Sequence, residues 1–255
     1  MSLLSLHGLS VTVGARQVCR DLDLRLEAGQ SWGLLGANGT GKTTLLHTLA
    51  GLRPPSAGEI RLNGVPLHAL PRRQLARQLG LLPQDSVDPM PATVLETALI
   101  GRHPHLGLWQ WESPADLALA RTALAAVELA DAETRPVGTL SGGERRRLAL
   151  ATLLTQAPRI HLLDEPTNHL DLRHQVGLLT LLRERVRDQG GLLVMSLHDL
   201  NLAARFCDHL LLLFGDGEVL AGPAAQVLAP AHLQRLYGHP IAVVESEGRR
   251  AFVPA

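Results

Sequence analysis

The segment GANGTGKTT, from Gly36 to Thr44, constrains the fold of this chain more than any other stretch. It satisfies the pattern G-x-x-x-x-G-K-[ST] and lies between the apolar run SWGLLG and the helical spacing of TTLLHTLAGL. Glycines let the backbone curl until its N–H groups and the helix N-terminus face an anion. The pattern predicts a strand, a phosphate-binding loop and a helix, with the nucleotide held by Gly36, Asn38, Gly39, Gly41, Lys42, Thr43 and Thr44.

Lys42 is the only lysine in a chain whose other basic residues are arginines. A compact ammonium reaches the β- and γ-phosphates of a nucleotide without the planar, two-pronged geometry that arginine imposes. The Thr43 hydroxyl that follows suits a magnesium ion. The single lysine thus indicates a nucleotide site with bound Mg²⁺.

The remainder of the chain alternates predicted strands and helices, which favours an α/β fold with a mainly parallel sheet and an antiparallel β element near the N-terminus. The run HLLLLFGDGEVLAG predicts a hairpin with its turn at Gly215–Gly217. Residues 89–155 are rich in alanine and leucine and predict helices without an intervening strand. We therefore predict one domain, with an α/β catalytic core formed by 1–88 and 156–255 and a helical subdomain at 89–155.

Composition weighs against several classes of protein. Lys+Arg and Asp+Glu balance at 24 each, so no basic field recommends nucleic acid as a partner. The two cysteines, Cys19 and Cys207, form neither a CxxC pair nor a zinc-ligand spacing, which fits a reducing cytosol. The longest apolar run is far shorter than the roughly 18 residues of a membrane helix, so we expect a chain that is soluble by itself.

Two acidic residues follow the apolar run IHLL. Asp164 and Glu165 come at the predicted carboxyl end of this strand, where ligands bind in sheets of this kind. Asp164 suits a Mg²⁺ contact through water, and Glu165 suits the positioning of an attacking water during phosphoryl transfer.

The segment LSGGERRR combines a helix start with two glycines. Ser141 and Glu144 have the spacing of a capping box. Gly142 and Gly143 lie inside the first turn, where glycine lowers the stability of the helix, so a cap alone does not explain them. They let backbone amides approach a phosphate closely.

With these motifs in order, the chain resembles the nucleotide-binding subunit of ATP-binding cassette (ABC) transporters over nearly its whole length. The resemblance implies a RecA-like P-loop NTPase core and hydrolysis of ATP with Mg²⁺. It assigns the catalytic roles to Lys42, Gln84, Glu165 and His198, and the metal contacts to Thr43, Gln84 and Asp164. Gln84 becomes the hinge glutamine, Asp171 part of the loop that links two sites, and His198 a contact of the γ-phosphate.

The resemblance also implies a head-to-tail dimer, in which Ser141, Gly142 and Gly143 of one copy complete the site built on Lys42 of the other. It further implies polytopic permease subunits, an indirect link to a periplasmic or surface substrate-binding protein, and a cytoplasmic place on the inner face of the membrane. The segments GRHPHL, DEPTNHLDL and HDLNLAARFCDH look most like importers of iron-siderophore, haem and cobalamin chelates. Alternatives are another ABC transporter, an exporter included, or an ABC ATPase of translation or DNA repair.

Two features of the sequence depart from this pattern or stay open. The family's adenine-stacking aromatic falls at Val13, so we expect loose base selectivity, with Arg16 as a candidate for stacking from the side. Trp109 and Trp111 fit either a contact with a membrane subunit or the core of the helical subdomain.

Overall fold

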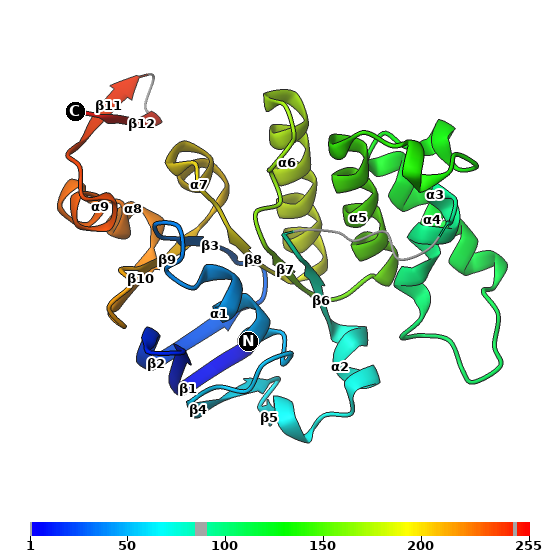
Figure 1. Cartoon of the computed structure of the whole chain (residues 1–255), viewed down its shortest axis with the longest axis horizontal. Coiled ribbons are helices and arrows are strands. Elements are labelled where there is room, and N and C mark those ends of the chain that lie inside the picture. Colours follow the sequence, from blue (N-terminus) through cyan, green and yellow to red (C-terminus); the bar gives the residue numbers. More distant parts are fainter. Residues whose placement is uncertain (1, 85–90, 247–248) are drawn as a thin grey trace.

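A computed structural model describes residues 2–84, 91–246 and 249–255 of the chain. Its centre is a six-stranded sheet in the order β10-β9-β3-β8-β7-β6, parallel except for β10 at one edge (Figure 1). The strands are β3 (Ser31–Leu35), β6 (Leu79–Leu82), β7 (Ile160–Leu163), β8 (Leu192–Ser196), β9 (His209–Leu213) and β10 (Val219–Pro223). The predicted α/β class is confirmed, and β9 and β10 are joined through the predicted glycine turn.

Both faces of this sheet are buried, which explains why its strands are continuous apolar runs. In β9, Leu210 and Leu212 join one apolar cluster, whereas Leu211 and Leu213 join another. The first cluster includes the buried faces of α6 (Leu172–Gln189) and α7 (Leu200–Phe206). The second includes α1 (Lys42–Leu49) and α2 (Arg72–Gln78).

An antiparallel sheet covers this second cluster, as predicted for the N-terminal part of the chain. Its strand order is β2-β1-β4-β5. The strands are β1 (Ser2–Val13), β2 (Arg16–Glu27), β4 (Ala57–Leu62) and β5 (Val65–Pro66). Buried leucines of β1 and Leu26 of β2 belong to the same apolar cluster as the leucines of α1.

Three helices lie together beyond β6, at one end of the molecule (Figure 1). They are α3 (Val94–Leu99), α4 (Pro114–Ala126) and α5 (Gly142–Gln156), and each begins with a capping box at Thr93, Ser113 or Ser141. We call 91–156 the helical subdomain; the predicted boundary between residues 88 and 89 lies outside the described residues. The Gln156 amide donates to the carbonyls of Ala76 and Leu79, at 2.6 and 3.1 Å, and so ties the end of α5 to β6.

The C-terminal part adds α8 (Ala224–Val227), α9 (Pro230–Tyr237) and a hairpin of β11 (Ile241–Ser246) and β12 (Arg249–Pro254). Asn201 on α7 holds this hairpin, because its Oδ1 accepts from the Phe252 N–H at 2.8 Å. Short 3-10 turns occupy Leu67–Ala69, Ile100–Arg102, Ala130–Ala132 and Val137–Thr139. In the described ranges no helix is both long enough and apolar enough to cross a membrane.

Candidate functional site

Two glycines of the loop between β3 and α1 have no room for a side chain. A Cβ on Gly36 would lie 2.6 Å from Thr40 Oγ1, and one on Gly41 would lie 2.5 Å from Val18 Cγ2. Gly41 also has φ +103°, in the left-handed region that glycine adopts without steric penalty. The loop can therefore pass tightly over β2 and begin α1 at Lys42.

Lys42 is almost completely buried, at 6% exposure, and its ammonium bonds to the loop itself. Nζ donates to the carbonyls of Gly36 at 2.8 Å and Ala37 at 3.2 Å. Burial lowers the pKa of Lys42, while the nearby Glu165 and Asp164 carboxylates act in the opposite direction. The ammonium thus lies within the curl of the loop, in the place that a phosphate-binding lysine requires.

The carboxyl ends of three adjacent strands meet at Glu165. This residue follows β7, Gln84 follows β6 and His198 follows β8, and parallel strands present such ends at the same edge of a sheet. His198 Nε2 lies 2.6 Å from Glu165 Oε1, and Gln84 Nε2 donates to Oε2 at 3.1 Å. The amide of Asn168 also donates to Oε2. Three side chains therefore fix the direction of one carboxylate.

Asp164, which precedes it, is fully buried, and its two oxygens differ. Oδ1 accepts from Ser196 Oγ at 2.6 Å, whereas Oδ2 has no hydrogen-bond partner in the described part of the chain. A buried carboxylate oxygen without a partner is costly, and a cation or its bound water would satisfy it. Asp164, the Thr43 hydroxyl and the Gln84 amide offer the hard oxygen ligands that Mg²⁺ prefers, so these residues fit the ion.

A cavity of about 550 Å³ joins these groups. Its lining comprises Asn38, Gly39, Gly41, Lys42, Thr43, Thr44, Gln84, Glu165 and His198. Residues up to 160 positions apart in sequence, such as Asn38 and His198, thus face one space that an anionic ligand can enter. Gly36 and Asp164 are not part of this lining. Gly36 accepts a hydrogen bond from Lys42, and Asp164 is fully buried beside Glu165 in sequence.

Sequence reasoning missed Arg146, which is buried beneath the site. One guanidinium nitrogen donates to the carbonyls of Pro83 and Gln84, at 2.6 and 3.1 Å. The other donates to the carbonyls of Asp164 and Glu165, at 2.5 and 2.9 Å. The run RRR does not itself say which arginine is buried. The helical periodicity identifies Arg146 as the buried arginine. It precedes the buried Leu150, Leu153 and Leu154 by four, seven and eight positions, so all four lie on one face of the helix.

The signature residues occupy the start of α5. Ser141 Oγ accepts from the Glu144 N–H at 3.2 Å, and Glu144 Oε2 accepts from the Ser141 N–H at 2.8 Å. These bonds and Arg135 hold the pKa of Glu144 at about 2. Ser141 and Gly142 are exposed, and in the described chain neither they nor Gly143 belong to the lining of the Lys42 cavity.

The other predicted nucleotide contacts are also separate from that cavity in the described chain. Asp171 caps α6 and accepts from the His174 N–H at 2.9 Å. Val13 is partly exposed at the end of β1, paired with Arg16 across the turn to β2. Arg16 donates to the Gly39 carbonyl at 2.5 Å, so its guanidinium is bonded to the phosphate loop.

The exposure of the two tryptophans decides between their two interpretations. Trp109 is 97% exposed and Trp111 is 86% exposed, and Leu108 beside them is 89% exposed. The interpretation of these side chains as subdomain core is therefore wrong. Large apolar side chains gathered on a surface indicate a contact site.

Residues 19–168 match the ABC transporter family, and the chain belongs to this family. It is an ATPase of the ABC type. Among its relatives is the hemin import ATP-binding protein HmuV of Pseudomonas entomophila, which is 42% identical over 242 residues, 92% of each chain.

Solved structures agree with this assignment. A chain from a transporter assigned to the metal-chelate ABC type, in an inward-facing conformation, superposes with a TM-score of 0.86 at 27% identity, covering 100% of this chain and 98% of that one. The dimeric structure of MJ0796, a bacterial ABC transporter cassette, gives a TM-score of 0.75 at 26% identity, covering 87% and 98%. As a subunit of this family, the chain works with membrane components of a transporter.

Proposed function

We propose that this ABC ATPase energises the import of a metal chelate, as two copies bound to a membrane permease. The observation that carries the proposal is the cavity in which the buried Lys42 and the firmly held Glu165 face the same space. The hemin importer subunit and the metal-chelate transporter among the similar proteins support the class of cargo.

Each residue of the cavity has a defined part in holding ATP. Lys42 exchanges the carbonyls of Gly36 and Ala37 for β- and γ-phosphate oxygens. Thr43, Gln84 and Asp164 would hold the magnesium ion, which would neutralise charge on the phosphate oxygens. His198 turns from Glu165 to the γ-phosphate, so that nucleotide binding releases one oxygen of the carboxylate.

Glu165 then positions the attacking water in line with the γ-phosphorus and accepts its proton. A new bond forms between the water oxygen and phosphorus, while the bond from phosphorus to the bridging oxygen breaks. ADP leaves with that bridging oxygen, and phosphate carries the water oxygen. Asn168 and Gln84 keep the second carboxylate oxygen in place during this step.

A second copy of the chain completes the site. The start of α5 presents Ser141 and Gly142 to solvent, away from the Lys42 cavity of the same chain. Exposed amides at a helix N-terminus bind anions, so this end suits the γ-phosphate held by another copy. The dimeric cassette among the similar structures supports a dimer. In the proposed dimer the two copies lie head to tail, with Asp171 between the two sites.

The membrane permease is the partner for Trp109 and Trp111. Both side chains are exposed on the helical subdomain, and tryptophans are typical anchors of protein interfaces. Such a complex places the chain on the cytoplasmic face of the membrane, where a periplasmic or surface protein would deliver the cargo to the other side.

Capture of the native complex tests this proposal. The Glu165→Gln protein is held in ATP in its host membrane, purified and analysed for co-purifying chains, with Lys42→Ala as the control that does not trap nucleotide. We expect a polytopic permease with two copies of this chain, lost in the control. Ribosomes or DNA-repair factors, without a membrane protein, would overturn the import function and leave the ATPase assignment intact.

A further inference from the structure

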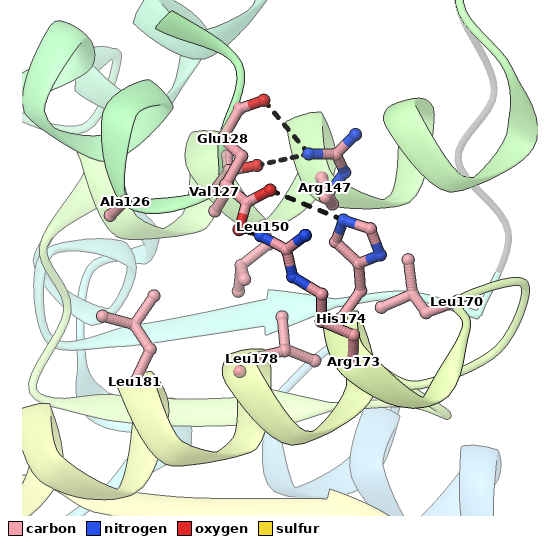
Figure 2. A pocket seen from close by; sticks show the side chains of 11 residues that line it. Ala126, Val127, Glu128, Arg147, Leu150, Leu170, Arg173, His174, Leu178 and Leu181 are labelled. Carbon is pink, nitrogen blue, oxygen red and sulfur yellow. Dashed lines mark hydrogen bonds and ion pairs between the residues drawn. The ribbon is translucent and has the colours of Figure 1, made fainter.

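The helical subdomain meets the catalytic core through a small ion cluster at the start of α6 (Figure 2). Glu128, just after α4, extends its carboxylate toward Arg173 and His174 of α6. Oε1 lies 3.4 Å from an Arg173 nitrogen, and Oε2 lies 3.6 Å from His174 Nε2. We call Glu128, Arg173 and His174 the Glu128 clasp.

The other ring nitrogen of His174 faces Asp171. Nδ1 lies 2.8 Å from Asp171 Oδ1, and the backbone N–H of His174 donates to the same oxygen at 2.9 Å. These bonds lower the pKa of Asp171, so that its carboxylate stays ionised. One imidazole therefore lies between a carboxylate of the helical subdomain and a carboxylate of the loop between the proposed sites.

The backbone of Glu128 is unusual for a residue with a side chain. Its φ is +57°, in the left-handed region where helices usually end on glycine. Arg147 of α5 fixes this turn by donating to the carbonyls of Val127 and Glu128, at 2.9 and 3.1 Å. Glycine would fit this backbone better, yet the chain has a carboxylate there.

The helical subdomain and the catalytic core leave a space between them next to the clasp. A cavity of about 200 Å³ lies there, with Leu150 of α5 on one side and Leu178 and Leu181 of α6 on the other (Figure 2). Apolar packing between α5 and α6 is therefore incomplete at this point.

A second contact joins the same two parts near the signature. A Cβ on Gly143 would lie 3.2 Å from the His169 carbonyl, so α5 approaches the segment that leads to Asp171. The helical subdomain thus meets this segment on both sides of Asp171, at His169 and at His174.

We propose that the Glu128 clasp makes the placement of Asp171 depend on the orientation of the helical subdomain. This inference rests on the proposed function, in which Asp171 and the Ser141 segment both approach the nucleotide of a second copy. Because Glu128 and Ser141 belong to one subdomain, its rotation moves the signature and, through His174, Asp171 together. Glu128 and His174 are positioning residues that act on hydrolysis through Asp171 and leave nucleotide binding to the Lys42 cavity.

A double-mutant cycle on the full chain tests the clasp. The variants are Glu128→Gly, His174→Ala and both together. Glu128→Gly suits the left-handed backbone, and His174→Ala keeps the backbone bond to Asp171, so both should fold. Glu133→Gln is the matched control, because it removes an exposed ion pair with Arg121 inside the helical subdomain. Steady-state ATP hydrolysis, nucleotide affinity and melting temperature are measured for each.

We expect kcat to fall about threefold or more in each single variant, and no further in the double variant, as for residues that act as one unit. The dissociation constant for ATP, the melting temperature and the control should stay at wild-type values. Unchanged kcat, effects that multiply in the double variant, or losses that follow the melting temperature would overturn the clasp. A wild-type chain that hydrolyses no ATP would instead overturn the function on which the clasp rests.

Discussion

Glu165 holds a backbone conformation that few residues with side chains adopt. Its φ is +48°, and its N–H donates to Ser196 Oγ at 2.8 Å. Such conformations cost of order 1–3 kcal/mol and persist where the surroundings determine them. Here the hydroxyl of Ser196 serves two neighbours at once, since it also donates to Asp164. The unusual backbone thus occurs at the carboxylate that, in the proposed mechanism, positions the attacking water.

Replacement of Glu165 by glutamine tests this role directly. We expect hydrolysis to fall by about 10²–10⁴-fold, the contribution of a positioned general base, because an amide does not accept the proton. ATP affinity should be retained, since Lys42 and its loop are unchanged. Phosphate release and binding of a fluorescent ATP analogue are measured beside Glu184→Gln, an exposed change on α6. If Glu165→Gln hydrolyses ATP at the wild-type rate, Glu165 is not the general base.

His161 is a buried polar residue outside the chemistry. It is 2% exposed on β7, and burial, with a smaller effect of Arg185, lowers its pKa from 6.5 to about 4. The unfolded chain therefore binds more protons than the folded chain between about pH 6.5 and pH 4. The contribution of His161 to stability therefore decreases as the pH falls through this window.

His161→Leu should remove this dependence. We expect the variant to lose less stability than wild type when urea unfolding is compared at pH 6.5 and pH 4.5. His239→Leu, at an exposed position, is the control and should keep the wild-type slope. Equal slopes for all three proteins would mean that His161 is not the group that titrates.

Base selectivity belongs to the residue scale as well. Val13 offers no aromatic face, and Arg16 is bonded to Gly39. We expect ATP and GTP to bind with similar dissociation constants, and Val13→Tyr to tighten both by stacking, which is worth about 1–3 kcal/mol per base. Competition titrations measure this, and a large preference of the wild type for ATP would contradict it.

At the scale of elements, α4 and α5 begin with the same capping motif, but we predict different functions for the two helix starts. Ser113 with Asp116 and Ser141 with Glu144 both form capping boxes. Both acids are held ionised, with pKa values of about 2. Only α5 continues with two glycines, and only its start carries the predicted nucleotide contact.

This pair of helices provides a matched experiment. Ser113→Ala and Ser141→Ala should each lower the free energy of unfolding by about 1 kcal/mol, the usual cost of a lost N-cap. Hydrolysis should fall only in Ser141→Ala, because in the proposed dimer its hydroxyl also contacts the nucleotide of the other copy. Urea unfolding and phosphate release separate the two effects. If the two variants hydrolyse ATP at equal rates, Ser141 acts only as a helix cap.

At the scale of the whole molecule, the three most exposed large apolar side chains of the described residues lie in one loop. These side chains, Leu108, Trp109 and Trp111, are almost fully exposed. Arg73 and Arg77 anchor the loop by donating to the Pro104 carbonyl at 2.9 and 2.7 Å. The base of the loop is thus fixed to α2 of the catalytic core, while its apolar side chains face outward.

Trp109→Ser with Trp111→Ser should weaken assembly with the permease by about tenfold or more, because buried tryptophans are common hot spots of interfaces. ATP affinity of the isolated chain should be unchanged. Leu172→Ser, at another exposed apolar position, is the control. Co-purification and titration with permease in detergent measure the effect. Wild-type assembly by the double variant would exclude this loop from the interface.

The sequence by itself determined the α/β class, the phosphate loop, the acidic strand end and the capped start of α5. These features depend on local chemistry: glycines that permit a curl, apolar periodicity, and a cap three residues before its partner. The family resemblance then added Gln84, Asp171 and His198 to the predicted site, because these residues occur in a specific order along the chain.

Only the tertiary structure decided what surrounds them. Arg146 reaches the Pro83 carbonyl 63 positions away, Ser196 reaches Asp164 across 32, and Glu128 meets His174 from another subdomain. Such contacts depend on the lateral order of β6, β7 and β8 and on where the helices are placed against the sheet. No local pattern encodes these distances, because they arise from the burial of both faces of the sheet at once.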